Sequence, residues 1–427
     1  MLNLKEVKSE RLGDSYYVLD HKSGLTVKLY PKRGHNSTYA IFGTKFGSIN
    51  TKFKITEKNE IVTVPDGIAH YLEHKLFESE DGDAFKKYAK TGASANAYTS
   101  FDMTGYLFSC TENFEESLKI LIELVQTPYF TDETVKKEQG IIGQEIKMYQ
   151  DDPSWRVMFN LYRAMFHEHP VKVEIAGSVE SIAKINPDNL YDCYNHFYNL
   201  NNMALCIAGK IDLDSTVKLI DSLVKPSKTS NIPESIFPDE PYKIVKNRVV
   251  EHLPVSIPNF QIGFKEEYTG GRLTDEDMAQ TSIILYTLAS KSSDLYKELL
   301  DKNLINESFG YEYFEGPGYN AVMFAGEARE PDKINEVLIK HVKNLKENGV
   351  KSQDFELAKK ALYGKAVRMF NSAENVADTM LALGFAGREI FSSVESIAKA
   401  SLDDVNKRLQ KQLDIDNSAI SIILPKW

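Results

Sequence analysis

The chain has 427 residues. At ~150 residues per domain, this length predicts two or three domains rather than one hydrophobic core. Hydrophobic residues make up 42% and charged residues 26%, which excludes collagen-like, low-complexity and mostly disordered chains. The net charge of −10 disfavours nucleic acid and anionic membranes as partners, and it favours cationic partners such as basic peptides.

The sequence predicts a cytoplasmic protein without a membrane-spanning helix. No run of ~18 apolar residues occurs, and the first twenty residues lack the apolar core of a secretory signal. The three cysteines, Cys110, Cys193 and Cys206, are few, odd in number and set in apolar surroundings. We therefore expect reduced core thiols rather than disulfides.

The first eighty residues predict strands followed by one short helix. Residues 16–20 and 25–30 flank a polar turn and predict a hairpin, and residues 38–45 alternate as a third strand does. The segment GIAHYLEHKLF, residues 67–77, predicts a helix, for which we expect Asp66 as the N-cap residue.

A second group of elements follows. Residues 96–101 and 104–110 predict another pair of strands. Residues 114–126 place their apolar side chains on one stripe, as an amphipathic helix does. A further helix over residues 132–149 must end before Pro153, because proline cannot donate the next backbone hydrogen bond.

The two halves of the chain are similar in sequence. Three pairs of segments recur in the same order with offsets of 215, 221 and 216 residues. The pairs are VESIAK at 179–184 and 394–399, GQEIKMY at 143–149 with GKAVRMF at 364–370, and GYLFS at 105–109 with AVMFA at 321–325. This near-constant offset predicts a duplicated unit. We expect an α+β fold of two homologous domains, each an antiparallel sheet packed with helices.

A linker is predicted between the halves. Residues 225–242 contain four of the fifteen prolines, together with serines and charges, and show no helical period. We therefore expect a metal-bearing N-terminal domain over residues 1–228, a linker over 229–242 and a homologous non-catalytic domain over 243–427.

Residues 70–74 read His-Tyr-Leu-Glu-His. On a helix, positions i, i+3 and i+4 share one face, so both imidazoles and the carboxylate converge. His70 and His74 suit a zinc ion, and Glu73 would lie close enough to act as general base on a zinc-bound water. Apolar neighbours predict that this helix is buried, where the polar groups need partners. A solvated surface cluster of His and Glu is the alternative.

The helix predicted over residues 132–149 offers a third ligand. Glu138 and Glu145 are two turns apart and share a face, although spacing alone leaves open whether they are ligands or solvated glutamates. In the repeat, Lys359 stands opposite Glu138 and Ala366 opposite Glu145. One half therefore carries the chemistry, and the other is expected to form a wall of the site.

These residues resemble a known family. His70-x-x-Glu73-His74, with a distal glutamate in GQEIKMYQDDP, resembles the inverted zincin pattern of the pitrilysin–insulinase metallopeptidases, which include the mitochondrial processing peptidases. The resemblance covers most of the chain, is strongest from Gly67 to Gly177, and is closest to the bacterial YmfH-like subgroup. The segments similar to that subgroup are VPDGIAHYLEHKLFE, DGDAF, GASANAYTSF, GQEIKMY and HPVKVEIAGSVESI.

The resemblance implies a set of site residues. His70, His74 and Glu145 would be the zinc ligands, and Glu73 the general base. Glu138 would be a carboxylate outside the ligand set that steadies one of the ligands, as metal-site histidines require.

The resemblance also implies a substrate strand. Residues 94–99 resemble the edge strand on which the family lays its peptide, in the manner of β-augmentation. Ala95 and Ala97 would let the substrate backbone approach, and Asn96 would hold its main chain. The residues alone favour an ordinary strand followed by a turn.

The second half departs from the family pattern. Many half-size relatives have an arginine and a tyrosine that support substrate and oxyanion binding. Here Asp294 stands in place of the arginine and Glu307 lies near the expected tyrosine. Tyr311 or Tyr313 can substitute for that tyrosine, and we take Tyr311 as a predicted substrate contact.

The sequence therefore predicts a zinc-dependent endopeptidase that cleaves short or unfolded peptides. One alternative is a peptide-binding subunit that completes the chamber of a heterodimeric peptidase, and another is a metal-dependent hydrolase of a different substrate. The family's closed chamber needs four domains and this chain supplies two. We therefore expect a homodimer, or a heterodimer with a related subunit that lacks the zinc motif.

Overall fold

The computed structural model describes residues 4–227 and 231–426, which fold as two compact units. Unit 1 comprises Met1–Ile146, Glu174–Ile236 and Val367–Phe391, and unit 2 comprises Lys147–Val173, Phe237–Ala366 and Ser392–Trp427. The domain limits expected at residues 228 and 243 stay a prediction. Residues 228–230, where the linker was expected to begin, lie outside the described residues.

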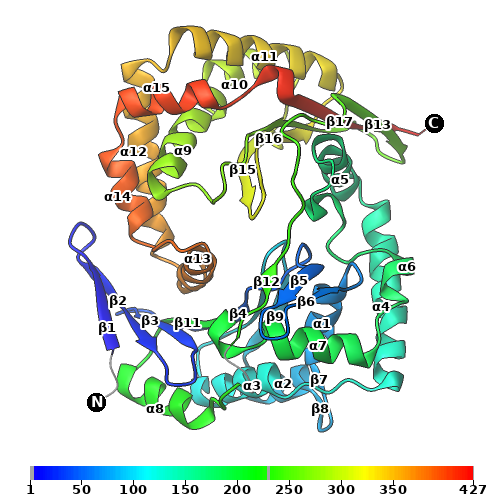
Figure 1. Cartoon of the computed structure of the whole chain (residues 1–427). Coiled ribbons are helices and arrows are strands. Elements are labelled where there is room, and N and C mark those ends of the chain that lie inside the picture. Colours follow the sequence, from blue (N-terminus) through cyan, green and yellow to red (C-terminus); the bar gives the residue numbers. More distant parts are fainter. Residues whose placement is uncertain (1–3, 228–230, 427) are drawn as a thin grey trace. The chain divides into compact units, whose positions relative to one another are not determined.

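Unit 1 is built on a seven-stranded sheet with the order β1-β2-β3-β11-β4-β10-β9 (Figure 1). Its strands are β1 (Leu4–Ser9), β2 (Asp14–Asp20), β3 (Thr26–Pro31), β4 (Thr38–Thr44), β9 (Ser94–Thr99), β10 (Thr104–Cys110) and β11 (Met203–Gly209). A smaller sheet has the order β12-β5-β6, and β7 pairs with β8. These strands are β5 (Lys52–Ile55), β6 (Glu60–Thr63), β7 (Glu78–Ser79), β8 (Gly82–Asp83) and β12 (Glu234–Ser235).

The helices of unit 1 match several of those predicted. They are α1 (Ile68–Leu76), α2 (Ala84–Thr91), α3 (Phe114–Gln126), α4 (Asp132–Asp151), α6 (Val179–Ile182), α7 (Pro187–Phe197), α8 (Leu213–Leu223), α13 (Ala373–Phe385) and the short η2 (Leu200–Asn202). The last residues of α4 belong to unit 2. The predicted helices over 114–126 and 132–149 are confirmed, and α4 ends before Pro153, the first residue of the next helix.

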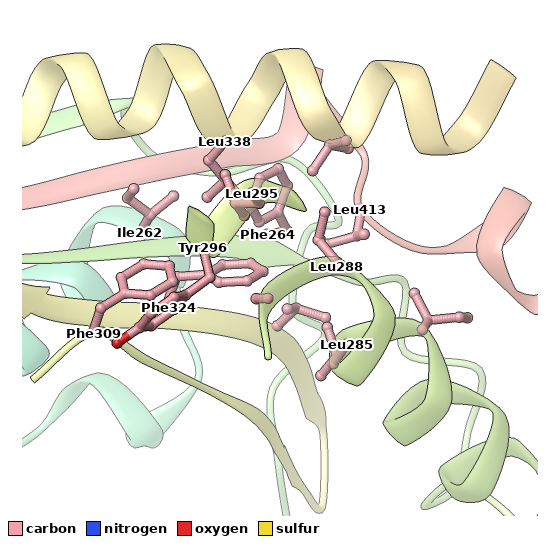
Figure 2. Close-up of a cluster of buried hydrophobic side chains, with 14 of the residues drawn as sticks. Ile262, Phe264, Leu285, Leu288, Leu295, Tyr296, Phe309, Phe324, Leu338 and Leu413 are labelled. Atoms are coloured by element: carbon pink, nitrogen blue, oxygen red, sulfur yellow. The ribbon is translucent and has the colours of Figure 1, made fainter. Parts of the chain in front are cut away.

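Unit 2 is built on a five-stranded sheet with the order β13-β17-β14-β16-β15. The strands are β13 (Arg248–Leu253), β14 (Asn259–Lys265), β15 (Gly310–Gly316), β16 (Tyr319–Glu327) and β17 (Ser418–Pro425). The helices are α5 (Pro153–Met165), α9 (Asp275–Ala289), α10 (Asp294–Asp301), α11 (Pro331–Asn348), α12 (Ser352–Met369), α14 (Ser392–Lys399), α15 (Leu402–Lys411), η1 (Pro170–Lys172) and η3 (Ile415–Asn417). The last residues of α12 belong to unit 1. Figure 2 shows the core between this sheet and its helices, where Phe264 and Phe324 lie beside Leu288 and Leu338.

The two main sheets share one topology. In both, strands that come first, fifth, second, fourth and third along the chain lie side by side, as β3-β11-β4-β10-β9 and as β13-β17-β14-β16-β15. The first pair in each set is parallel and the other pairs are antiparallel. The predicted α+β duplication is therefore confirmed, with one parallel pair in each otherwise antiparallel set.

One helix packs on the equivalent strands of each sheet. In unit 2, α5 packs on β14 and β17, and in unit 1, α13 packs on β4 and β11. A glycine opens room for each helix. A Cβ added to Gly43 of β4 would lie 2.6 Å from Leu381 of α13, and one added to Gly263 of β14 would lie 2.5 Å from Met165 of α5. The sheet faces at these two points are thus filled by helix side chains.

The buried cysteines and the hydropathy of the helices agree with the sequence predictions. Cys110, Cys193 and Cys206 are buried free thiols. Within the described residues, no helix combines enough length and apolarity to cross a membrane.

Candidate metal centre

Helix α1 begins at a close contact between two backbone segments. Gly67 precedes it with a φ of 88°, and a Cβ there would lie 2.3 Å from the carbonyl oxygen of Ala176. The prediction that Asp66 caps this helix is wrong, because the left-handed Gly67 is the N-cap residue and no side chain caps the helix. The backbone carbonyl of Asp66 instead accepts a hydrogen bond from Ser181 Oγ at 2.8 Å.

The three motif residues of α1 share one face of the helix, as predicted. His70 and Glu73 are 7% and 8% exposed, and His74 is half-buried. The two imidazole centroids lie 4.6 Å apart. Burial at this level requires partners for both rings and for the carboxylate.

Helix α4 supplies the third member of the cluster. Glu145 Oε1 lies 3.6 Å from His70 Nε2, and Glu145 Oε2 lies 3.4 Å from His74 Nε2. One donor atom from each of these residues lies within 4.8 Å of the others. Zinc with four ligands at ~2.0–2.1 Å places neighbouring donors roughly 3.4 Å apart. Both the types of donor and their separations therefore fit a zinc ion.

Glu138 orients one of the histidines. His74 Nδ1 donates to Glu138 Oε1 at 3.0 Å, which leaves Nε2 directed toward Glu145. Burial lowers the pKa of His74, but the hydrogen bonds to Glu138 and Glu145 outweigh it and raise the pKa to about 10. The carboxylates thus stabilise positive charge at this point, which a metal cation also supplies.

Glu73 lies beside the cluster and has a partner of its own. Thr99 of β9 donates a hydrogen bond from Oγ1 to Glu73 Oε2 at 3.0 Å. Burial raises the pKa of Glu73, opposed by the charges of His70 and His74 and by the bond from Thr99. No individual role was predicted for Thr99. The only available signal was its place at the end of the predicted strand.

Strand β9 carries the predicted substrate contacts. Ala95, Asn96 and Ala97 lie on this strand, and the exposed Asn96 side chain accepts a hydrogen bond from the Ala97 N–H at 2.9 Å. In the part of the chain that the structure describes, β9 pairs only with β10, so its other edge has no neighbouring strand.

The remaining predicted contact lies in unit 2. Tyr311 is on β15 and packs against the hydrophobic core of that unit, where burial raises its pKa to about 12. Tyr313, two residues further, donates to Glu266 Oε2 at 2.9 Å. A role of Tyr311 in substrate binding stays a prediction.

Comparison with known proteins agrees with the resemblance seen in the motif. Residues 63–179 match the model of the insulinase family, peptidase family M16, and residues 184–362 match the model of the M16 inactive domain. The chain is 37% identical over 428 residues to the zinc protease YmfH of Bacillus subtilis, an alignment that covers 99% of this chain and 100% of YmfH. It is 24% identical over 375 residues to the B. subtilis zinc protease YmxG, covering 84% of this chain and 88% of YmxG.

Solved structures extend the comparison to the whole fold. An M16-like peptidase from Alicyclobacillus acidocaldarius matches with a TM-score of 0.92 and 32% identity, covering 100% of this chain and 99% of that one. Pitrilysin matches with a TM-score of 0.75 and 18% identity, and this chain covers 47% of its length. The full-length similarity to YmfH and the two family matches together show that the chain belongs to the insulinase family of peptidases, family M16.

Proposed function

We propose that this chain is a zinc endopeptidase that cleaves short or unfolded peptides. The observation that carries the proposal is the cluster of His70, His74 and Glu145 donor atoms within 4.8 Å, with Glu73 beside it and held by Thr99. The relatives named zinc proteases support the same metal and the same reaction class.

The residues of the cluster have distinct roles in this proposal. A zinc ion held by His70, His74 and Glu145 would supply an acidified water and a Lewis acid for the scissile carbonyl. Glu138 accepts the Nδ1 proton of His74 and so presents Nε2 as the donor. Thr99 holds Oε2 of Glu73, which leaves Oε1 to take the proton of the nucleophilic water and pass it to the leaving amine.

Strand β9 is the proposed substrate-binding edge. A peptide added as a further strand would pair with backbone groups that β10 does not use. The small side chains of Ala95 and Ala97 would allow its close approach. The hydrogen bond from Thr99 to Glu73 joins this strand to the proposed base, so the bound backbone would pass the reacting groups.

Oligomeric state and location belong to the same proposal. We expect a homodimer, or a heterodimer with a related subunit that lacks the zinc motif, because a closed chamber of the family needs four domains. Light scattering of the purified chain tests for the homodimer, and co-purification of a related chain tests for the heterodimer. The buried free thiols agree with the predicted cytoplasmic location.

The experiment compares the wild type with Glu73→Gln on internally quenched peptides, with and without a chelator. General-base catalysis contributes typically ~10²–10⁴-fold, so we expect a loss of that order in Glu73→Gln with zinc retained. Cleavage of esters but not peptides would favour a different hydrolase. A zinc-loaded wild type that cleaves no peptide would contradict an enzyme that is active alone, and would favour the peptide-binding subunit.

A further inference from the structure

A buried tyrosine joins the two helices that carry the metal cluster. Tyr71 of α1 is 0% exposed, and its hydroxyl donates a hydrogen bond to the carbonyl oxygen of Val135 in α4. Val135 lies three residues before Glu138, within one turn of α4. The phenol is therefore bonded to the helical turn from which Glu138 extends.

Glu138 is the link between this turn and the cluster. Its carboxylate accepts the hydrogen bond from His74 Nδ1 at 3.0 Å, and His74 Nε2 lies 3.4 Å from Glu145. We propose that Tyr71 is a positioning residue, whose hydroxyl holds Glu138 in register with His74 and so orients His74 toward the metal. This inference rests on the proposed function, because it assumes that the cluster binds zinc.

Apolar packing of this part of α4 is non-directional. The buried residues of α4 are Val135, Ile142, Gly143 and Ile146, and Val135 and Ile142 lie about one turn to either side of Glu138. A slip of one residue along a helix moves a side chain by ~1.5 Å and rotates it by about 100°. That movement would break the hydrogen bond between Glu138 and His74, so the register of α4 needs a directional contact.

A second polar contact between the helices is weaker. Glu78 pairs with Lys75 of α1 and, at 3.7 Å, with Lys137 of α4. The Lys137 side chain is 65% exposed, and exposed ion pairs contribute only ~0–1 kcal/mol. The hydrogen bond of Tyr71 is fully buried, so of these two contacts Tyr71 is the stronger determinant of the register.

The test measures zinc affinity by competition with a chromophoric chelator. Loss of a group that orients a metal ligand typically costs ~10–100-fold in affinity, which is the expectation for Glu138→Gln. Tyr71 acts one contact further away, so we expect about 3–10-fold weaker binding in Tyr71→Phe. If Tyr71 acts through Glu138, Tyr71→Phe changes affinity by less than about 2-fold when Glu138→Gln is already present.

Tyr194→Phe is the matched control. The Tyr194 hydroxyl donates to the Val125 carbonyl oxygen at 2.9 Å and so joins α7 to α3 rather than α1 to α4. We expect Tyr194→Phe to lower thermal stability about as much as Tyr71→Phe and to leave zinc affinity unchanged. The visible spectrum of the Co²⁺-loaded protein should change in Tyr71→Phe and not in Tyr194→Phe.

The outcomes separate this inference from the proposed function. A wild type that binds no zinc would overturn both. A wild type that binds zinc, with equal affinity in Tyr71→Phe and Tyr194→Phe, would overturn the inference alone. The same holds if Tyr71→Phe weakens binding as much in the Glu138→Gln protein as in the wild type, because Tyr71 would then act independently of Glu138.

Discussion

Thr99 connects the proposed general base to the proposed substrate strand. Its hydroxyl donates to Glu73 Oε2 at 3.0 Å, and a valine in its place would keep the shape of the side chain without this bond. We predict that Thr99→Val lowers kcat about 10-fold, because a base that is less well oriented transfers the proton less efficiently. KM and zinc content should stay within about 2-fold. Steady-state kinetics on the quenched peptide measure both constants.

Thr38→Val is the control for that variant. The hydroxyl of Thr38, on β4, donates to the Lys210 carbonyl oxygen at 2.8 Å, so its loss should affect stability and leave kcat largely unchanged. Equal losses of kcat in Thr99→Val and Thr38→Val would contradict the orienting role of Thr99.

His169 predicts a dependence of stability on pH. It is fully buried, with Nδ1 accepting from the Val171 N–H at 3.1 Å and Nε2 donating to the Pro317 carbonyl oxygen at 2.8 Å. Burial lowers its pKa to about 4 from an ordinary value near 6.5. The unfolded chain therefore binds a proton that the folded chain excludes, and stability falls as the pH drops from about 6.5 to 4.

The size of this loss of stability follows from the lowering of the His169 pKa. One pKa unit corresponds to about 1.4 kcal/mol, so His169 should account for about 3 kcal/mol of the lost unfolding free energy. Urea unfolding at several pH values measures it. His169→Gln should flatten the profile across that range, and an unchanged slope in the variant would assign the pH dependence to other groups.

Individual residues of the site were predictable only where a local pattern determines them. The i, i+3, i+4 spacing on one helix was sufficient to bring His70, Glu73 and His74 to one face. Glu145 needed the family resemblance, because spacing alone does not distinguish a ligand from a solvated glutamate. Thr99 and Tyr71 could not be predicted, since their partners belong to other elements and depend on tertiary packing.

At the scale of elements, Gly67 determines where α1 begins. Its φ of 88° is strained for other residues, and a Cβ there would meet the Ala176 carbonyl oxygen at 2.3 Å. We predict that Gly67→Ala lowers the unfolding free energy by about 2–4 kcal/mol, from backbone strain and the steric conflict together. Zinc affinity should fall as well, because α1 carries two of the proposed ligands.

Gly34 offers a control for this substitution. It has a similar φ of 81°, but a Cβ there would have no neighbour within 4 Å. Gly34→Ala should therefore cost only the strain of about 1–2 kcal/mol and leave zinc affinity unchanged. Chemical denaturation of both variants gives the difference. If Gly67→Ala lowers the unfolding free energy no more than Gly34→Ala does, the close packing at the start of α1 is contradicted.

The sequence predicted elements better than it predicted their partners. The hairpin β2–β3 and the helices α3 and α4 have local patterns, and the structure confirms them. The parallel pairing of β3 with β11 was not predicted, because the two strands lie far apart in the chain and no turn links them. The packing of α13 on the sheet of unit 1 was not predicted either, because α13 lies far along the chain from the strands that it covers.

At the scale of the whole molecule, the duplication was visible in the sequence. Near-constant offsets between three pairs of segments predicted it, and the shared strand order of the two sheets confirms it. The similar short segments fall on equivalent elements, since GYLFS lies in β10 and AVMFA lies in β16. Glu138 and Glu145 of the proposed site correspond to Lys359 and Ala366 in the second half. The two halves therefore share the strand order but not the proposed site residues.

Metal removal should destabilise the molecule. A ligand bound only to the folded state adds about 4 kcal/mol at a concentration 1,000 times its dissociation constant. We predict that a chelator lowers the thermal unfolding midpoint of the wild type and has little effect on His74→Ala, which lacks one proposed ligand. Scanning fluorimetry measures both. Equal shifts in the two proteins would mean that the chelator acts at another site.

The most direct test of the account is the zinc content of the purified chain, measured by atomic emission on protein that has never met a chelator. We predict about one zinc per chain in the wild type and in Glu73→Gln, and a much lower content in Glu145→Gln, because a catalytic zinc needs three protein ligands. A wild type without metal, or full occupancy in Glu145→Gln, would contradict the proposed metal centre.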